Sequence, residues 1–229
     1  MNIVAILAGG SGKRVGGDIP KQFLPFNGKM LLQHTIDAFE KNGLVDRIIV
    51  VAPRNYVDKL RDLCGKEGYQ KWDTIVEGGA ERYLSSYAAI RACNETDGNL
   101  LIHDAARPFV SQSLITRLIV ELRDFSAVVP VLSLSDTLVE VNDDCVIAVP
   151  DRQKYRQVQT PQAFHLALIK EAFEYVLKNV NYCFTDDCSV LLRYNPQSRV
   201  KVVEGDKNNF KLTYHTDIEY FNEIFKKNG

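Results

Sequence analysis

The sequence predicts an α/β fold, in which a Rossmann-like, mixed but mostly parallel sheet carries helices on both faces. Nearly continuous apolar runs such as Arg47–Ala52 are typical of strands buried on both sides of a parallel sheet. Apolar residues at helical spacing precede and follow these runs, as in the segment 30–42. The alternation extends along the 229 residues without a linker or repeat, so we expect one domain over residues 1–229.

The chain opens on an apolar strand that runs into a glycine-rich, basic loop. The strand Ile3–Leu7 is followed by Ala8–Arg14, where glycines allow backbone N–H groups to approach an anion and basic side chains neutralise it. The P-loop pattern fails here, because Leu7 and Arg14 stand where it requires Gly and then Ser or Thr. The dinucleotide pattern also fails, because Val15 replaces its third glycine. A phosphate cradle is the working hypothesis, and a plain turn after an edge strand is the alternative.

Two later strands also end in loops that carry functional residue types. The predicted strand 72–77 runs into Gly78-Gly79, and Leu100–Ile102 runs into His103–Pro108. Loops after different strands of a parallel sheet converge at its carboxyl edge, so we expect these segments to line one crevice. The remaining predicted strands are 127–131 and 202–205. Four predicted helices cover 30–42, 54–67, a segment that begins at 82, and about 113–123. Three more are predicted around Ile169, Phe173 and Val176, directly after Thr185-Asp186-Asp187, and around Ile218, Phe221 and Phe225.

Residues 133–150 interrupt this alternation. Polar and apolar residues alternate there around Asn142-Asp143-Asp144, which is typical of a β-hairpin that leaves the main sheet. A protruding arm usually needs a partner surface to cover it. We therefore expect a dimerisation arm at about 133–155, with a solvated loop as the alternative.

The composition excludes several classes of protein. A net charge of −1 gives no general attraction to nucleic acid or to an anionic membrane, so any anion site must be local. The apolar start is too short for a signal peptide or a membrane span. The five cysteines lack C-x-x-C spacing and read as free thiols of a cytoplasmic protein.

Seven short segments follow one another along nearly the whole chain: Leu7–Arg14, Pro20-Lys21-Gln22, Gly78–Ser85, His103–Pro108, Asp151-Arg152, Thr160-Pro161-Gln162 and Asn209-Phe210-Lys211. In this order they resemble the 2-C-methyl-D-erythritol 4-phosphate cytidylyltransferases. The resemblance implies the nucleotidyltransferase fold, a homodimer formed through the arm, and transfer of CMP from CTP to a polyol phosphate with release of pyrophosphate. It also implies Mg²⁺ carried by the phosphates of CTP, without dedicated protein ligands but with Asp104 as a candidate contact.

The same resemblance implies roles for individual residues. Arg14 and Lys21 match the residues that stabilise the transition state at the α-phosphate, and Arg152 and Lys211 match the pair that positions the attacking phosphate. The positions that match CTP contacts are Leu7, Ala8, Gly9, Gly10, Gly79, Arg82, Ser85 and Asp104. Those that match acceptor contacts are Asp104, Arg107, Thr160 and Thr185, although Thr185-Asp186-Asp187 read by itself is a helix N-cap.

The identity of the acceptor stays open between two groups. The segments His103–Pro108 and Thr185–Ser189 look more like the methylerythritol-phosphate enzymes, whereas Leu7–Gly10 and Lys21–Leu24 look somewhat like the related ribitol-5-phosphate cytidylyltransferases. We expect the acceptor to be that of the methylerythritol-phosphate enzymes. A nucleotide-binding module without catalysis would not need four cations. A Rossmann oxidoreductase would carry an acidic residue where Leu31-Leu32-Gln33 stands.

Overall fold

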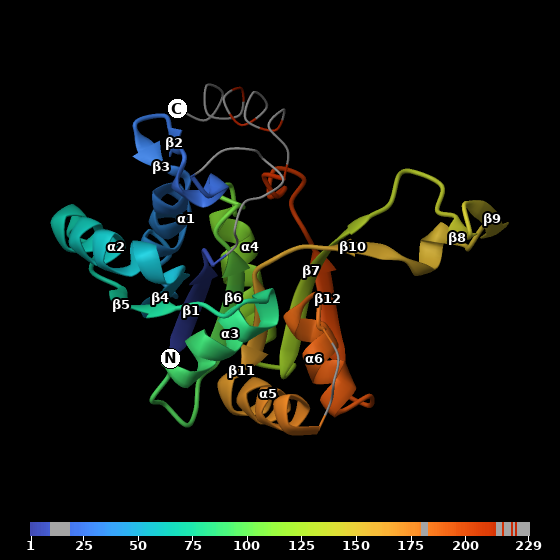
Figure 1. Cartoon of the computed structure of the whole chain (residues 1–229). Coiled ribbons are helices and arrows are strands. Elements are labelled where there is room, and N and C mark those ends of the chain that lie inside the picture. The colour runs from blue at the N-terminus through green and yellow to red at the C-terminus, as the bar shows by residue number, and fades with distance from the viewer. Residues whose placement is uncertain (10–18, 180–182, 214–216, 218–220, 222, 224–229) are drawn as a thin grey trace.

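A computed structural model describes residues 1–9, 19–179, 183–213, 217, 221 and 223. Within these residues the central sheet has eight strands in the order β10-β7-β11-β6-β1-β4-β5, with β12 paired to β7 (Figure 1). Only β10 and β11 run antiparallel to their neighbours, and the other pairs are parallel. The bounds are β1 (Asn2–Leu7), β4 (Arg47–Ala52), β5 (Trp72–Glu77), β6 (Asn99–Asp104), β7 (Ala127–Ser133), β10 (Arg156–Val158), β11 (Gln162–His165) and β12 (Val200–Glu204).

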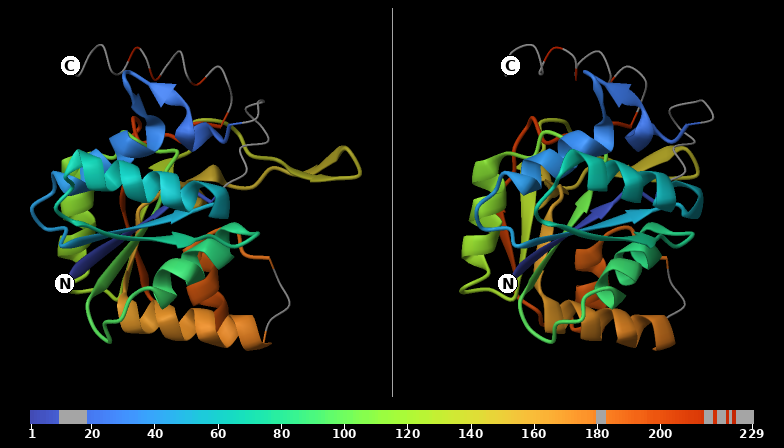
Figure 2. Two further views of the ribbon diagram at one scale, coloured as in Figure 1. Left: turned by 60° about the vertical axis from the view of Figure 1, so that its left-hand side comes forward. Right: turned by 90° about the vertical axis from the view of Figure 1, so that its left-hand side faces the viewer.

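Helices cover both faces of this sheet, which confirms the predicted fold class (Figure 2). One face packs against α1 (Leu31–Glu40), α2 (Arg54–Glu67) and α4 (Gln112–Glu121). The opposite face packs against three further helices, which are α3 (Arg82–Arg91), α5 (Leu166–Asn179) and α6 (Asp187–Tyr194).

The apolar strands are continuous because each one faces two cores. In β1, Val4 and Ile6 join the core under α1, whereas Ile3 and Ala5 join the core under α3 and α5. All four side chains are fully buried. This two-sided burial is the reason that a parallel strand shows no polar alternation in its sequence.

The helix and strand bounds follow the sequence patterns within a few residues. The strands 47–52 and 72–77 and the helix 54–67 have the predicted bounds. The helix α2 ends where Gly68 adopts the left-handed conformation with a φ of 70°. The short segment from Arg156 to His165 supplies both antiparallel strands. Residues 218 and 225 of the last predicted helix lie outside the described residues.

An arm leaves the sheet between β7 and β10. Its tip is a two-stranded hairpin of β8 (Glu140–Asn142) and β9 (Cys145–Ala148), followed by the 3₁₀ turn η2 (Arg152–Lys154). Asp143 and Asp144 have φ values of 46° and 62°, as the two central residues of a tight hairpin turn require. In Figure 1 the arm stands clear of the helices and the sheet.

A third, smaller apolar cluster lies beside the main sheet. It joins the short strands β2 (Pro25–Phe26) and β3 (Lys29–Met30) to loop residues that include Ala106 and Leu212. Phe221 is fully buried at its centre, with ring centroids 4.6 Å from Phe210 and 5.8 Å from Phe26. Among the described helices, none is long and apolar enough to cross a bilayer.

Candidate active site

The loops that follow β1, β5 and β6 emerge at one edge of the sheet. Leu7 and Asp104 are register partners at the ends of β1 and β6. The N–H of Ala105 donates to the carbonyl of Leu7 over 3.0 Å, and the N–H of Gly78 donates to the carbonyl of Ala52 over 2.9 Å. The starts of the three predicted loops, at Ala8, Gly78 and Ala105, therefore lie at the same carboxyl edge.

Two glycines allow the β1 and β5 loops to approach Ser85. A Cβ atom built on Gly9 would lie 2.9 Å from Ser85 Oγ, and one built on Gly78 would lie at the same distance from it. Any side chain at either position would displace the hydroxyl. Gly79 has a different constraint, since its Cβ would lie 2.3 Å from Leu84 Cβ and would push α3 away. Gly10, also predicted to contact CTP, lies outside the described residues.

Asp104 is the centre of a group of three cations. Arg82 Nε donates to Asp104 Oδ1 over 3.0 Å, and Lys211 Nζ donates to Oδ2 over 2.7 Å. Arg107 Nε lies 3.9 Å from the same Oδ2. Burial of Asp104 by itself raises the pKa of its carboxyl, but the charges of Arg82, Lys211 and Arg107 hold that pKa well below its usual range. Asp104 therefore carries its negative charge near neutral pH.

Two predicted cations meet at the loop 209–212. Lys21 Nζ donates to the carbonyl of Leu212, the residue next to Lys211. The N–H of Leu212 in turn donates to the carbonyl of Ala106 over 2.9 Å, just after β6. Lys21 therefore contacts the loop that carries Lys211, and Lys211 itself is paired with Asp104. Arg14, the other cation predicted at the α-phosphate, lies outside the described residues.

Thr160, predicted to contact the acceptor, is buried and hydrogen-bonded internally. Its hydroxyl accepts from the N–H of Asp104 over 3.1 Å and lies 3.0 Å from His103 Nδ1. His103 Nε2 lies 3.0 Å from the carbonyl of Arg107, which accepts only if that nitrogen carries the proton. The pKa of the buried His103 is lowered to about 4, so its ring is neutral and Thr160 donates its own proton to Nδ1.

The remaining predicted site residues lie in different parts of the molecule and differ in exposure. Arg107 is buried and donates from Nη1 to the carbonyl of Asn209 over 2.8 Å. Thr185 is exposed just before α6, where Asp186 caps the helix by accepting from the N–H of Ser189 over 3.0 Å. Arg152 is exposed on the arm, where it donates to the carbonyl of Ser135.

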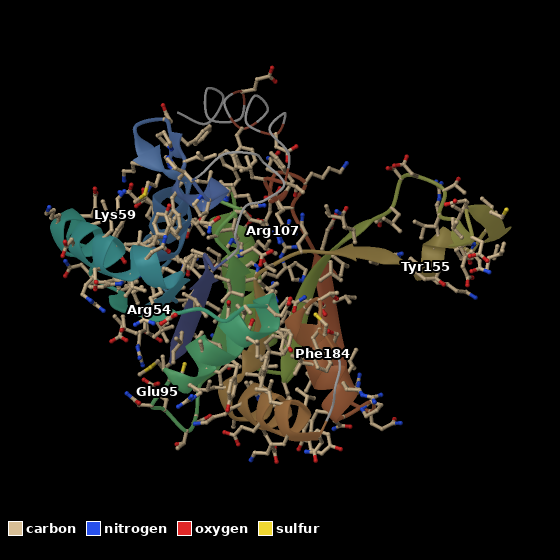
Figure 3. The ribbon with its side chains drawn as sticks, viewed as in Figure 1. Arg54, Lys59, Glu95, Arg107, Tyr155 and Phe184 are labelled. Atoms are coloured by element: carbon tan, nitrogen blue, oxygen red, sulfur yellow. The ribbon has the colours of Figure 1, made fainter. Side chains whose placement is uncertain are left out.

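Arg152 and Lys211, predicted as a pair, are not brought together within one chain. Arg152 begins the 3₁₀ turn of the arm, whereas Lys211 is paired with Asp104 at the carboxyl edge. Figure 3 shows the separation between the two regions, with Tyr155 labelled on the arm and Arg107 near the carboxyl ends of the strands.

Comparison with known proteins places these observations in one family. The family model described as 2-C-methyl-D-erythritol 4-phosphate cytidylyltransferase matches residues 2–227. The chain belongs to this family. The enzyme of that name from Thermobifida fusca is 39% identical over 221 residues, which cover 93% of this chain and 89% of that protein.

Other relatives bear on the acceptor and on the fold. The bifunctional ribulose 5-phosphate reductase/CDP-ribitol pyrophosphorylase of Haemophilus influenzae is 38% identical over 98% of this chain, which covers 48% of that protein. The crystal structure of 4-diphosphocytidyl-2C-methyl-D-erythritol synthase from Anaerococcus prevotii superposes with a TM-score of 0.86 at 30% identity, over 98% of this chain and 96% of that one. This cytidylyltransferase is therefore a nucleotidyltransferase in both sequence and fold.

The cytidylyltransferase carries site residues that sequence reasoning did not select. Gln22 is buried and donates to the carbonyl of Ala8 over 2.6 Å, which fixes the start of the first glycine loop. Asp187, read only as part of an N-cap, is fully buried and accepts from Arg82 Nη1 over 2.8 Å. For Gln22 the sequence offered one indication of a role, which was its position directly after Lys21 in a motif. Asp187 had none, because its partner stands 105 positions earlier in the chain.

The described residues of this cytidylyltransferase hold no cluster of three or more His, Cys, Asp or Glu side chains with the arrangement of a metal site. Asp104 is the acidic side chain at the carboxyl edge that was considered as a metal ligand. Its two oxygens already accept from Arg82 and Lys211.

Proposed function

We propose that this cytidylyltransferase transfers CMP from CTP to 2-C-methyl-D-erythritol 4-phosphate, giving the CDP-polyol and pyrophosphate. The supporting observation is the convergence of Arg82 and Lys211 on Asp104, with Lys21 bound to the neighbouring Leu212, at the edge of the sheet where Gly9 and Gly78 allow a close approach to Ser85. The membership of the family over residues 2–227 supports the same reaction.

The proposed reaction is an in-line displacement at the α-phosphorus of CTP. An oxygen of the acceptor phosphate forms the new P–O bond while the bond to the bridging oxygen breaks, and pyrophosphate leaves with that electron pair. The phosphate of the acceptor is already nucleophilic near neutral pH, so the chain needs no covalent nucleophile. Its task is to hold two anions together and to neutralise the charge that gathers around the phosphorus.

The cationic side chains divide this task. Lys21 and Arg14, which belong to the first two of the seven segments, act on the charge of the transferred phosphoryl group. Lys211 and Arg152 hold the attacking phosphate. Mg²⁺ accompanies CTP and, when bound, neutralises part of the charge on the triphosphate.

We also propose that the functional unit is a homodimer formed through the arm. The arm exposes apolar side chains to a degree that favours a partner, since their exposed fractions lie between 49 and 65%. These residues are Val139, Val141, Val146, Ile147 and Val149. A second copy would cover them and would bring Arg152 to Lys211 of its partner, which one chain alone does not do. The five free cysteines favour the reducing cytoplasm as the compartment.

Ribitol 5-phosphate is the second candidate acceptor. The Haemophilus relative named for CDP-ribitol is 38% identical over 98% of this chain, close to the 39% of the Thermobifida enzyme. Both acceptors carry a phosphate and several hydroxyls, so a single polar contact in the site can decide which of the two is the better substrate.

Pyrophosphate release with each acceptor tests the proposal. At saturating CTP, we expect kcat/KM for 2-C-methyl-D-erythritol 4-phosphate to exceed that for ribitol 5-phosphate by about 100-fold, because a buried polar group left unpaired costs roughly 1–3 kcal/mol. The reverse order would assign the chain to the ribitol enzymes. Release with neither acceptor would reject both.

A further inference from the structure

The first turn of α6 is fastened to β11 by one glutamine. Gln162 Oε1 accepts from the N–H groups of Asp187 and Cys188 over 3.0 and 2.9 Å. Its Nε2 donates to Asp186 Oδ2 over 2.8 Å. Because Gln162 is fully buried, these bonds are shielded from water and the backbone of Asp187 is fixed relative to the sheet.

Arg82 uses this fixed point to bridge two carboxylates. Its Nη1 donates to Asp187 Oδ2 over 2.8 Å, and its Nε donates to Asp104 Oδ1 over 3.0 Å. The side chain of Asp187 is 0% exposed and that of Arg82 is 22% exposed. A planar guanidinium donates to two carboxylates in fixed directions, whereas the three donors of a lysine ammonium rotate freely.

The bridge determines which oxygen of Asp104 remains for Lys211. Since Arg82 donates a single N–H to Oδ1, Lys211 Nζ holds Oδ2 at 2.7 Å. If Arg82 were released from Asp187, its fork could turn and bind both oxygens of Asp104, because a bidentate pair is the strongest arrangement for Arg and a carboxylate. Lys211 would then lose its anchor.

We propose that Asp187 is a positioning residue, which acts through Arg82 and Asp104 to keep Lys211 in place for the acceptor. This assigns Arg82 to the orientation of Asp104 rather than to direct contact with CTP. The inference rests on the proposed function for the part that Lys211 plays in the reaction. Its structural part, the link from Asp187 to Lys211, can be measured without turnover.

The kinetic test is Asp187→Asn, which keeps the shape of the side chain and removes its charge. We expect KM for the polyol phosphate to rise about tenfold while KM for CTP stays within about twofold, because only the acceptor is held by Lys211. Arg82→Lys is the second variant and should give the same split, since lysine lacks the rigid fork that donates to each carboxylate from a separate nitrogen. Equal increases in both constants, or a lower melting temperature with unchanged constants, would overturn the proposal.

Asp73→Asn is the matched control. It breaks another Arg–Asp pair, between Arg47 Nη2 and Asp73 Oδ2 at 2.8 Å, at the start rather than the end of the strands. Arg47 keeps Glu95 as a second partner at 2.5 Å, and Figure 3 labels Glu95 well away from Arg107. Both constants should be unchanged in this variant.

The measurement without turnover is the rate at which an amine-reactive reagent labels Lys211, followed by mass spectrometry of its peptide. Lys29 is an internal reference, because its Nζ lies 2.7 Å from Asp37 and its side chain is 39% exposed, against 2.7 Å and 38% for Lys211. In Asp187→Asn and in Arg82→Lys we expect Lys211 to label about three times faster or more, with Lys29 unchanged. An unchanged ratio in both folded variants would refute the link. A wild-type protein without turnover would refute the proposed function instead, while the labelling ratio would still decide this inference.

Discussion

Lys21 is the single side chain on which the proposed chemistry depends most. It comes from the segment before β2 and donates to the carbonyl of Leu212, so it is tied to the loop that carries Lys211. Lys21 and Lys211 would therefore both be held at the loop 209–212 when the substrate binds. In the proposed reaction Lys21 acts on charge that develops only as the α-phosphorus is attacked.

Lys21→Ala should therefore reduce kcat far more than CTP binding. Loss of one preorganised charge that acts in the transition state costs about 100- to 1000-fold in rate. Pyrophosphate release gives kcat, and calorimetric titration with CTP gives the affinity, which should change by less than about fivefold. Turnover of this variant at the wild-type rate would remove Lys21 from the mechanism.

His103 makes the stability of the protein depend on pH. Burial lowers its pKa from 6.5 to about 4, so the unfolded chain binds a proton more readily between these values. The stabilisation is complete above pH 6.5 and is lost as the pH falls to about 4, to an extent on the order of 3 kcal/mol. Denaturant titrations at several pH values should show this slope in the wild-type protein and a shallower one in His103→Gln. Parallel curves for the two proteins would contradict the assignment.

Some of these residues could be selected from the sequence and others could not. Lys211 and Asp104 stand at or just after predicted strand ends or within motifs, which suggested their position at the carboxyl edge. Thr160 belonged to a motif as well, but nothing in the sequence indicated that its hydroxyl would be bound between Asp104 and His103. Hydrogen bonds between distant positions depend on the order of the strands, which local patterns do not encode.

At the scale of elements, the N-cap that the sequence predicts for α6 can be tested by substitution. Asp186 accepts from the N–H of Ser189 over 3.0 Å and also receives Nε2 of Gln162 over 2.8 Å. Asp186→Ala should lower the free energy of unfolding by about 1 to 2 kcal/mol, because it removes the cap and one bond to Gln162. Urea denaturation measures this change. A loss below about 0.3 kcal/mol would show that the cap contributes little.

The arm is the element whose role is most open to direct test. A charge on its apolar surface should prevent association, so Val146→Lys is expected to shift the sedimentation profile from dimer to monomer and to abolish turnover. The hairpin itself should survive, since Val146 is 60% exposed in the chain. Val120→Lys, on the outer side of α4, is the control and should leave the association state unchanged. A monomer with full activity would show that the arm is not needed.

Element types and bounds were largely predictable, because the two-sided burial of β1 and β4 and the amphipathic faces of α1 and α5 leave clear periodic patterns. The sheet order was not predictable. The segment of β11 is only four residues long, and its place between β6 and β7 comes from pairings with Leu101 and Val128, far away in the sequence.

At the scale of the whole molecule, each active site of the proposed dimer contains parts of two chains. Lys211 would come from one subunit and Arg152 from the other. Arg152→Ala and Lys211→Ala should each be inactive alone, but mixed dimers of the two contain one intact site. After random exchange of subunits, activity should return to about a quarter of the wild-type value. Failure of the mixture to recover any activity, with mixed dimers present, would place both residues in the same chain's site.

The central claim is direct transfer of CMP at the carboxyl edge of the sheet, and the ³¹P NMR spectrum of the reaction tests it most directly. With CTP, Mg²⁺ and 2-C-methyl-D-erythritol 4-phosphate, we predict equal amounts of pyrophosphate and CDP-polyol, and no loss of CTP when the acceptor is left out. Hydrolysis of CTP to CMP without an acceptor, or an acceptor that remains unchanged while CTP is consumed, would contradict the claim.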